Sequence, residues 1–266
     1  MNRTIVAIVV SLAAGFAAGA WTNRAASTPQ PEAGNAGGSF DASAPLEDRI
    51  AAVTDGIDAD WFVFCNGELR DRAAPDGVAV DKLASAPVGD NALAELNAAL
   101  LRDGLRLRIE STPVKPIGLL FIDGGETAAV SQGYVEIESA AGTSAEIVEF
   151  HTSIGDADHY ANTAVKLDIG DNALLAHLRI QERGFDHQQT GRTTVSVGRD
   201  ARFSSASFDL GGGMVRNDLD IDIAHPGAEV SFDGLYLAGD GQHIDNHTRV
   251  DHRVGPATSR QEYRGI

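Results

Sequence analysis

Apolar and polar residues alternate with period two from Gly104 onward, in short runs that come in pairs around a turn glycine. The turn glycines Gly142, Gly170, Gly198 and Gly227 lie 28, 28 and 29 residues apart. The runs that precede them are Val135/Ile137, Val165/Leu167/Ile169, Val195/Val197 and Leu219/Ile221/Ile223. The runs that follow them are Ile147/Phe150, Leu174/Leu178/Ile180, Phe203/Phe208 and Val230/Phe232/Leu235.

A repeat of this length is typical of a solenoid. Each unit has room for two short strands and for no long helix. The pattern therefore predicts an all-β parallel β-helix over residues 104–266, in which each strand pairs with its counterpart one coil along. The alternative is a multi-sheet sandwich, because short strands at this spacing also fit that architecture.

Residues 56–103 are expected to form a short lead-in of strand and helix. Asp60–Gly67 predicts a strand that ends in an Asn-Gly turn. Asp90–Gly104 predicts a helix that Asp90 or Asn91 caps and that ends at Gly104 in a left-handed conformation. Its apolar face is expected to carry Leu93, Leu96 and Leu100.

The N-terminal part has a different composition. Ile5–Trp21 is uncharged and mostly apolar, with Arg3 before it and Arg24 after it. Residues 1–24 are thus predicted to be a membrane anchor or a signal peptide, with residues 5–21 as the membrane segment. Residues 25–55, rich in Ala, Gly, Ser and Pro at first, are expected to be a disordered linker.

Charge and cysteine content narrow the possible functions. The chain has 38 acidic and 21 basic residues and a formal charge of −17, so a nucleic-acid partner is not expected. The single cysteine, Cys65, excludes a disulfide within the chain and a four-cysteine iron–sulfur site. Cys65 ends an apolar run, so we expect a small buried side chain, with a reactive thiol as the alternative.

Three segments near the end of the sequence carry a resemblance: GLYL (Gly234–Leu237), DGQHIDNHTRVDH (Asp240–His252) and TSRQEYRGI (Thr258–Ile266). The chain resembles the SufB/SufD family, and the SufD branch more than the SufB branch. The resemblance covers roughly Asp58–Ile266, the middle of a family member. It implies a right-handed parallel β-helix and a cytoplasmic location, with anchoring through residues 5–21 as a possible addition.

The resemblance also implies a function and partners. Family members are non-catalytic scaffold subunits of the SUF iron–sulfur cluster assembly machinery. A SufB-like subunit would bind through the β-helix. The SufC-like ATPase docks in the family on a C-terminal helical region, which the resemblance does not reach here. No cofactor is expected on this chain alone, and an iron–sulfur cluster is implied only for the assembled complex.

The histidine-rich segment Asp240–His252 is the candidate for metal chemistry. Period two places His243, Asp245, His247, Arg249 and Asp251 on one face of a strand. His243 and His247 would then lie about 13 Å apart, too far for one metal ion. We predict a hydrogen-bonded polar ladder, with a metal site or a partner-binding surface as alternatives; the role of His252 stays open. No catalytic or metal-ligating residue is predicted, and no cofactor-binding residue is assigned.

The acidic residues support an alternative function. Asp168, Asp171, Asp218, Asp220 and Asp222 could mimic the carboxylates of a sugar-cleaving β-helix. The alternative is therefore an exported, membrane-tethered β-helix protein that binds or acts on carbohydrate. Alternation of Asp218, Asp220 and Asp222 with apolar residues instead predicts a solvent-facing stripe on a half-buried strand.

Overall fold

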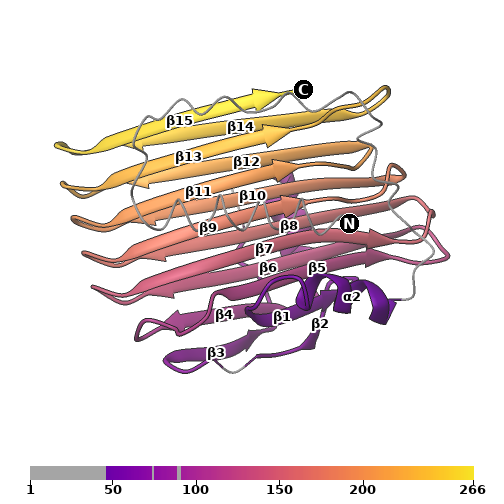
Figure 1. The fold of residues 1–266 in the computed structure, drawn as a ribbon, viewed down its shortest axis with the longest axis horizontal. Coiled ribbons are helices and arrows are strands. Elements are labelled where there is room, and N and C mark those ends of the chain that lie inside the picture. The colour runs from indigo at the N-terminus through magenta and orange to yellow at the C-terminus, as the bar shows by residue number, and fades with distance from the viewer. Residues whose placement is uncertain (1–45, 74, 89–90) are drawn as a thin grey trace.

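Two parallel sheets face each other and form a parallel β-solenoid of about six turns (Figure 1). The computed structural model describes residues 46–73, 75–88 and 91–266. One sheet, here called sheet A, has the order β15-β13-β11-β9-β7-β5-β1-β2. The other, sheet B, has the order β14-β12-β10-β8-β6-β4-β3. The chain passes from one sheet to the other at each successive strand from β4 onward.

The strands of sheet A are β1 (Asp60–Cys65), β2 (Glu68–Asp71), β5 (Ile117–Gly124), β7 (Ser144–Ile154), β9 (Leu174–Gln181), β11 (Arg202–Asp209), β13 (Glu229–Tyr236) and β15 (Thr258–Gly265). The strands of sheet B are β3 (Val78–Leu83), β4 (Gly104–Ile109), β6 (Ala129–Ser139), β8 (His159–Ile169), β10 (His187–Val197), β12 (Met214–Ile223) and β14 (His243–His252). The helices are α2 (Leu46–Thr54) and α3 (Ala92–Leu100).

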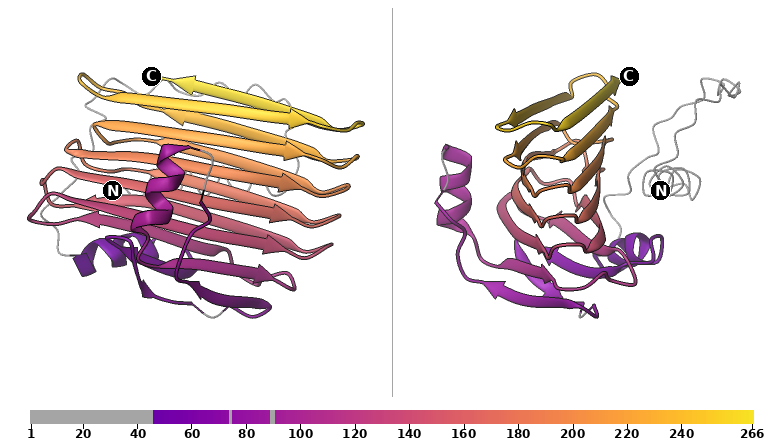
Figure 2. Two further views of the ribbon diagram at one scale, coloured as in Figure 1. Left: turned by 180° about the vertical axis from the view of Figure 1, so that it is seen from behind. Right: turned by 90° about the vertical axis from the view of Figure 1, so that its left-hand side faces the viewer.

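Strand pairing confirms the predicted β-helix. From β4 to β15 every strand pairs in parallel with the strand two positions along the chain, as β8 does with β10 and β10 with β12. Sequence neighbours such as β8 and β9 lie in opposite sheets. A sandwich of antiparallel hairpins is therefore excluded for these residues. The end-on view in Figure 2 shows the coils stacked as two walls.

The lead-in residues extend both sheets at the N-terminal end. β1 pairs in parallel with β5 and in antiparallel with β2. Asn66 and Gly67, with φ of 49° and 79°, form the predicted turn between β1 and β2. The strand β3, which the pattern did not predict, pairs in antiparallel with β4. The first coil is thus covered at the edge of each sheet by an antiparallel strand.

The two helices lie on opposite outer faces of the solenoid (Figure 2). The helix α2 packs Val53 against an apolar cluster on the outer face of sheet A, which includes Leu120, Val148 and Phe150. Arg49 of α2 also binds the Thr152 hydroxyl and the Glu182 carboxylate. The prediction of a disordered linker over residues 25–55 is therefore wrong for Leu46–Thr54, which is helical. This helix is stabilised by packing on the apolar outer face of sheet A, which the composition of the linker does not reveal.

The second helix is held by a polar side chain. Asn91 caps α3 by accepting a hydrogen bond from the Ala94 N–H at 3.0 Å. Asn97 is buried and donates from Nδ2 to the carbonyls of Gly133 and Asn162, at 2.8 and 3.1 Å. Leu100, expected on the buried face, is 51% exposed. The expected left-handed end at Gly104 is also wrong.

Gly104 opens β4 instead, and the helix has already ended at Leu101. A Cβ on Gly104 would lie 3.0 Å from the Leu83 Cβ and 3.3 Å from a methyl of Leu101. The glycine therefore permits close packing of the strand start rather than a left-handed turn.

The corners of the coils correct the glycine repeat. The left-handed position of the corner before β7, β9, β11 and β13 is occupied by Gly142, Asn172, Asp200 and Gly227 respectively. Gly170 and Gly198 lie two residues before this position, and a Cβ on them would come 2.6 and 2.7 Å from backbone oxygens of the preceding coil. The repeat is real, but its glycines serve two different purposes.

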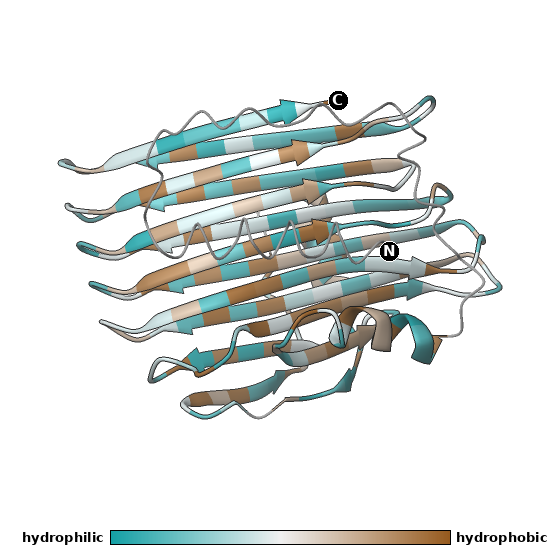
Figure 3. Ribbon diagram, viewed as in Figure 1, coloured by the Kyte–Doolittle hydropathy of each residue, from teal (hydrophilic) through white to brown (hydrophobic). Residues whose placement is uncertain are grey.

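The interior is apolar along the side where the strands of sheet B end and those of sheet A begin. Inward residues there form one continuous cluster that includes Leu107, Ile137, Leu167, Val197 and Phe203. Apolar and polar bands alternate along most strands (Figure 3). The predicted inward positions in sheet B, such as Val165/Leu167/Ile169, are confirmed as buried.

The predicted anchor, residues 5–21, lies outside the described residues. Within the described part of the chain, neither helix has the length and apolar character that a membrane crossing requires.

Candidate functional site

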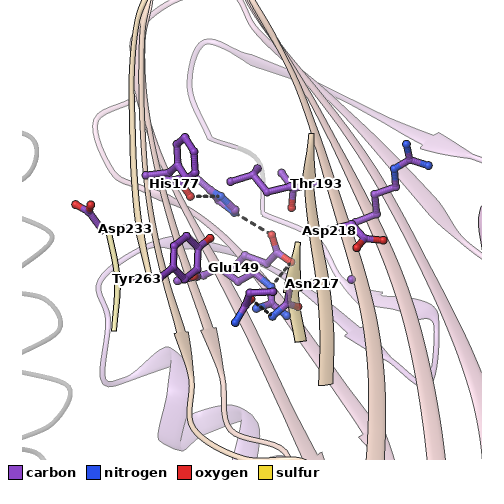
Figure 4. A pocket seen from close by; sticks show the side chains of 15 residues that line it. Glu149, His177, Thr193, Asn217, Asp218, Asp233 and Tyr263 are labelled. Carbon is purple, nitrogen blue, oxygen red and sulfur yellow. Dashed lines mark hydrogen bonds and ion pairs between the residues drawn. The ribbon is translucent and has the colours of Figure 1, made fainter. Parts of the chain in front are cut away.

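The interior is polar along the opposite side, where the strands of sheet A end and those of sheet B begin. The charged side chains there form the candidate site. On β7 the inward positions are Ile147, Glu149 and His151, while Val148 and Phe150 point outward into the cluster under α2. On β9 they include His177 and Arg179. Charged residues thus occupy inward positions where a simple β-helix would carry apolar side chains. Figure 4 shows Glu149 and His177 facing each other inside the solenoid.

Glu149 lies at the centre of this group and is 2% exposed. Its carboxylate is 2.5 Å from His151 Nε2 and 2.9 Å from His177 Nε2. The Arg179 Nε atom lies 3.8 Å away. Burial by itself raises the pKa of Glu149, but the hydrogen bonds from the two histidines outweigh burial and hold the pKa well below its usual value. Glu149 is therefore ionised.

Both histidines approach this carboxylate through Nε2. Burial lowers the pKa of His151 to about 4, despite its bond to Glu149. His151 then carries its proton on Nε2, where it donates to Glu149, and its Nδ1 has no partner among the described residues. On His177, Nδ1 is 3.3 Å from the Ser205 hydroxyl, which can donate to it. Nε2 of both rings thus faces Glu149.

Arg179 links this group to the next coils. It donates from Nη1 to the Asp209 carboxylate at 2.9 Å. Asn217 of β12 donates from Nδ2 to both oxygens of Asp209, at 3.0 and 2.9 Å, and to Asn246 Oδ1 of β14 at 3.1 Å. The polar interior therefore crosses from sheet A to sheet B and reaches the last coil.

A second ion pair lies nearer the first coils. Arg183 is 2% exposed and donates to Asp123 Oδ2 at 2.6 Å, to Gln189 Oε1 at 2.6 Å and to the Thr152 carbonyl at 3.0 Å. The rings of His159 and His187 lie beside it, with their centroids 5.8 Å apart. Burial lowers the pKa of both imidazoles.

These contacts define what the site can do. Its carboxylates and guanidinium groups are paired with each other across three or more coils, which fixes the coils relative to one another. Among residues 46–73, 75–88 and 91–266, no group of three His, Cys, Asp or Glu side chains has a geometry that could hold a metal ion. The chemistry supported here is a rigid, hydrogen-bonded polar interior.

The sequence interpretation missed this site, although a signal was present. Because side chains alternate along a strand, Glu149 and His151 lie on the same face of β7 as Ile147. Arg179 likewise lies on the same face of β9 as His177. The apolar residues of a run normally indicate the face that points inward. In sheet A the outward face is apolar as well, because α2 and its surroundings cover it.

The histidine-rich strand is a polar ladder on the outside. The side chains of His243, His247 and Arg249 are exposed, and those of Asp245 and Asp251 are half-buried. His247 Nε2 is 2.9 Å from Asp245, and Arg249 lies 3.9 Å from Asp251. His252 Nε2 binds the Ser259 hydroxyl at 2.9 Å. These contacts agree with the predicted polar ladder, in which His247 is hydrogen-bonded to Asp245 and Arg249 forms a looser ion pair with Asp251.

The acidic stripe on β12 is also confirmed. Asp218, Asp220 and Asp222 alternate with inward Leu219, Ile221 and Ile223. Each pairs with an arginine: Asp218 with Arg216 at 3.1 Å, Asp220 with Arg192 at 2.9 Å, and Asp222 with Arg253 at 2.8 Å.

The two remaining acids of the sugar-cleaving alternative are engaged as well. Asp168 lies 2.7 Å from Lys166 Nζ. Asp171 accepts a hydrogen bond from the Arg199 N–H at 2.8 Å. Together with the paired carboxylates on β12, these contacts do not support a sugar-cleaving acid and nucleophile.

Cys65 lies at the end of β1, half-buried against the apolar cluster on the outer face of sheet A. Burial raises the pKa of its thiol, and the nearby Arg70 counteracts that effect only in part. A raised pKa disfavours the thiolate, which is the reactive form. These observations fit a packing role for Cys65.

Two parallel sheets built coil by coil define a parallel β-solenoid, a repeat architecture in which each coil contacts its neighbours. The model of the family described as SUF system FeS cluster assembly, SufBD core domain, matches residues 121–266. The chain belongs to this SufBD family.

Individual relatives agree with this assignment. An iron–sulfur cluster assembly SufBD family protein of Mycobacterium bovis is 27% identical over 194 residues, which cover 73% of this chain and 46% of the relative. The iron–sulfur cluster assembly protein SufD of Escherichia coli is 24% identical over 157 residues, covering 58% of this chain and 37% of that protein. The chain thus spans less than half the length of these relatives.

Proposed function

We propose that this protein is a non-catalytic, SufD-like scaffold subunit of the SUF iron–sulfur cluster assembly machinery. Membership of the SufBD family supports a place in cluster assembly. The feature that supports the scaffold role is the buried polar interior, in which charged side chains of successive coils pair with one another, as Arg179 does with Asp209. A solenoid held rigid in this way offers an extended surface to partner subunits.

The absence of a catalytic role is part of the proposal. The buried carboxylate of Glu149 is bound on both oxygens by histidines, and the Ser205 hydroxyl on the other side of His177 is itself buried, away from solvent and substrate. Cys65 lies on the outer face of sheet A, with a raised thiol pKa. These features support a rigid framework rather than a reaction centre.

The partners follow from the same proposal. A SufB-like subunit would bind through the β-helix, and a SufC-like ATPase would join the complex. The iron–sulfur cluster is cargo of the complex and not a resident group of this chain. One thiol cannot supply the usual set of cysteine ligands. We place the complex in the cytoplasm.

Binding through the strands of the β-helix can be tested at β15. The Thr258 N–H donates to the Ala228 carbonyl, and the Ile266 N–H donates to the Tyr236 carbonyl of β13, at 3.0 Å each. Because N–H groups alternate in direction along a strand, the Gln261 N–H points away from β13. Gln261→Pro therefore removes a backbone donor on the side away from β13 without removing a bond to β13. Gln261→Ala is the matched control, since it also loses the side-chain bond to Thr248.

The measurement is co-purification with a SufB-like subunit, followed by titration of the binary complex. We expect the proline variant to lose at least tenfold in affinity, while the alanine variant binds as the unchanged chain does. Equal affinity for both variants would remove β15 from the interface. Failure of the unchanged chain to bind any SufB-like subunit would argue against the scaffold role itself.

A further inference from the structure

Gly191 lies in the middle of β10, between Thr163 of β8 and Asn217 of β12. Its φ is outside the left-handed region, so the backbone does not require glycine here. The position faces the polar interior, and Gly191 lines a cavity of about 30 Å³ together with Arg179 and Asn217. What distinguishes Gly191 is the space that its missing side chain leaves.

Three polar atoms converge on that space. A Cβ on Gly191 would lie 3.2 Å from Asn217 Oδ1, 3.5 Å from Arg179 Nη2 and 3.8 Å from Gln189 Nε2. Each of these atoms is buried and has no hydrogen-bond partner among the described residues. Arg179 is 6% exposed and Gln189 is 0% exposed. Buried polar groups are nearly always hydrogen-bonded, so three such atoms around one point indicate a missing partner.

The chemistry of the three atoms specifies this partner. Arg179 Nη2 and Gln189 Nε2 are donors. Asn217 Oδ1 is an acceptor, because its Nδ2 is committed to Asp209 and Asn246. A molecule that accepts two hydrogen bonds and donates one satisfies all three atoms. One water molecule needs a cavity of at least about 10–15 Å³, measured as the space open to the centre of a water molecule. The cavity beside Gly191 has about 30 Å³ by the same measure, so it suits a single water or a molecule of similar size.

The charge of the surroundings argues against an anion. The Arg179 guanidinium already faces the carboxylates of Glu149 and Asp209, at 3.8 and 2.9 Å. The formal charge of these three groups together is −1, so a further negative charge would be repelled in this buried position.

We propose that Gly191 marks a buried binding site for one small neutral molecule that both accepts and donates hydrogen bonds, with water as the occupant. The occupant connects Arg179 of sheet A with Gln189 and Asn217 of sheet B, at the end of the interior where charged groups replace apolar packing. This site is independent of the proposed function, since it follows from the packing of the interior alone.

Two substitutions at Gly191 test the site. Gly191→Ala places a methyl group where the molecule would lie and leaves the three polar atoms without a partner. Gly191→Ser adds the same Cβ with a hydroxyl that can both accept and donate. We expect Gly191→Ala to lower Tm by about 3–8 °C and Gly191→Ser to restore at least half of that loss. Equal Tm values for the two variants would overturn the proposal.

Gly133 of β6 provides a matched control. It pairs with Thr163 of β8, which pairs on its other side with Gly191 of β10, so both glycines hold equivalent positions in neighbouring coils. A Cβ there would lie 2.9 Å from the Phe121 ring and 3.2 Å from the Thr163 methyl group, both apolar. Serine at Gly133 should therefore give no advantage over alanine. A similar advantage of serine at Gly133 would show that the effect at Gly191 is not specific.

A crystal structure of the chain, with a bromide soak, identifies the occupant. We expect density for one water within about 3.2 Å of at least two of the three atoms. An anomalous bromide peak at this position would overturn the assignment of a neutral occupant. Side chains that pair with each other, with no density between them, would overturn the site.

Discussion

Arg183 and Asp123 are 60 residues apart in the sequence, yet Arg183 Nη2 and Asp123 Oδ2 lie 2.6 Å apart in the buried interior. The pair joins the end of β5 to the segment after β9, two coils further along sheet A. The Arg183 side chain is 0% exposed and that of Asp123 is 6% exposed. Neither charge can reach water without opening the solenoid, so each depends on the other.

Removal of one member of this pair should therefore destabilise the fold strongly. Arg183→Met leaves the Asp123 carboxylate buried and unpaired, and we expect a loss of about 3–5 kcal/mol in the free energy of unfolding. Asp123→Leu combined with Arg183→Met should cost less than the sum of the two single changes. Denaturant unfolding measures all three variants. The control is Arg202→Met, because Arg202 and its partner Glu229 have 63% and 55% of their side chains exposed, and such a pair should contribute at most about 1 kcal/mol.

The buried histidine beside Glu149 predicts a pH dependence of stability. Burial lowers the pKa of His151 from 6.5 to about 4, so the unfolded chain binds this proton more readily than the folded one. The associated stability is complete above about pH 6.5 and is lost as the pH falls toward 4, by about 3 kcal/mol at 1.36 kcal/mol per pKa unit. The lowered pKa of Glu149 adds a further loss below about pH 4.5.

Unfolding free energies measured from about pH 7.5 down to about pH 4, that is, from above the ordinary pKa of 6.5 to the lowered pKa of His151, test this dependence. His151→Gln should flatten the slope between pH 6.5 and 4. The exposed His243→Gln serves as the control for the loss of a surface imidazole. An unchanged slope in His151→Gln would show that the acid sensitivity arises from other groups.

The helix α3 should depend on Asn97 more than on its leucines. Asn97→Ala removes two hydrogen bonds and leaves the carbonyls of Gly133 and Asn162 without this donor. We expect a loss of about 1–3 kcal/mol and faster amide exchange over Ala92–Leu100. Leu100→Ala, at an exposed position of the same helix, should leave exchange unchanged. Similar exchange in the two variants would mean that apolar contacts hold the helix.

The two kinds of corner glycine should respond differently to the same substitution. Gly142 has φ of 73° and no atom within 4 Å of the place that a Cβ would take, and asparagine occupies the equivalent corner at Asn172. Gly142→Asn should thus cost less than about 1 kcal/mol. Gly170→Asn should cost about 1–3 kcal/mol, because its Cβ would lie 2.6 Å from the Ser139 carbonyl oxygen. Thermal unfolding compares the two, and equal costs would contradict this assignment of the corners.

The sequence alone determined the coil repeat. Residues with period two in sheet B, such as Val165, Leu167 and Ile169, face inward as expected, because a polar outer face leaves only one place for apolar side chains. The alternation in Asp218–Ile223 has the same basis. The glycine spacing of about 28 residues also came close to the coil length, because the equivalent corner residues Gly142, Asn172, Asp200 and Gly227 are 30, 28 and 27 residues apart.

Tertiary structure decided the rest, for a physical reason that Glu149 and Phe150 illustrate. Alternation tells which residues share a face of a strand, but it does not tell which face is inside. Around Glu149 and Phe150 both faces of sheet A are covered, one by sheet B and one by α2, so hydrophobicity does not distinguish the two faces. Phe150 therefore points outward and Glu149 inward. The partners of Glu149 include side chains from another coil, and only the stacking of the coils brings them within hydrogen-bond distance.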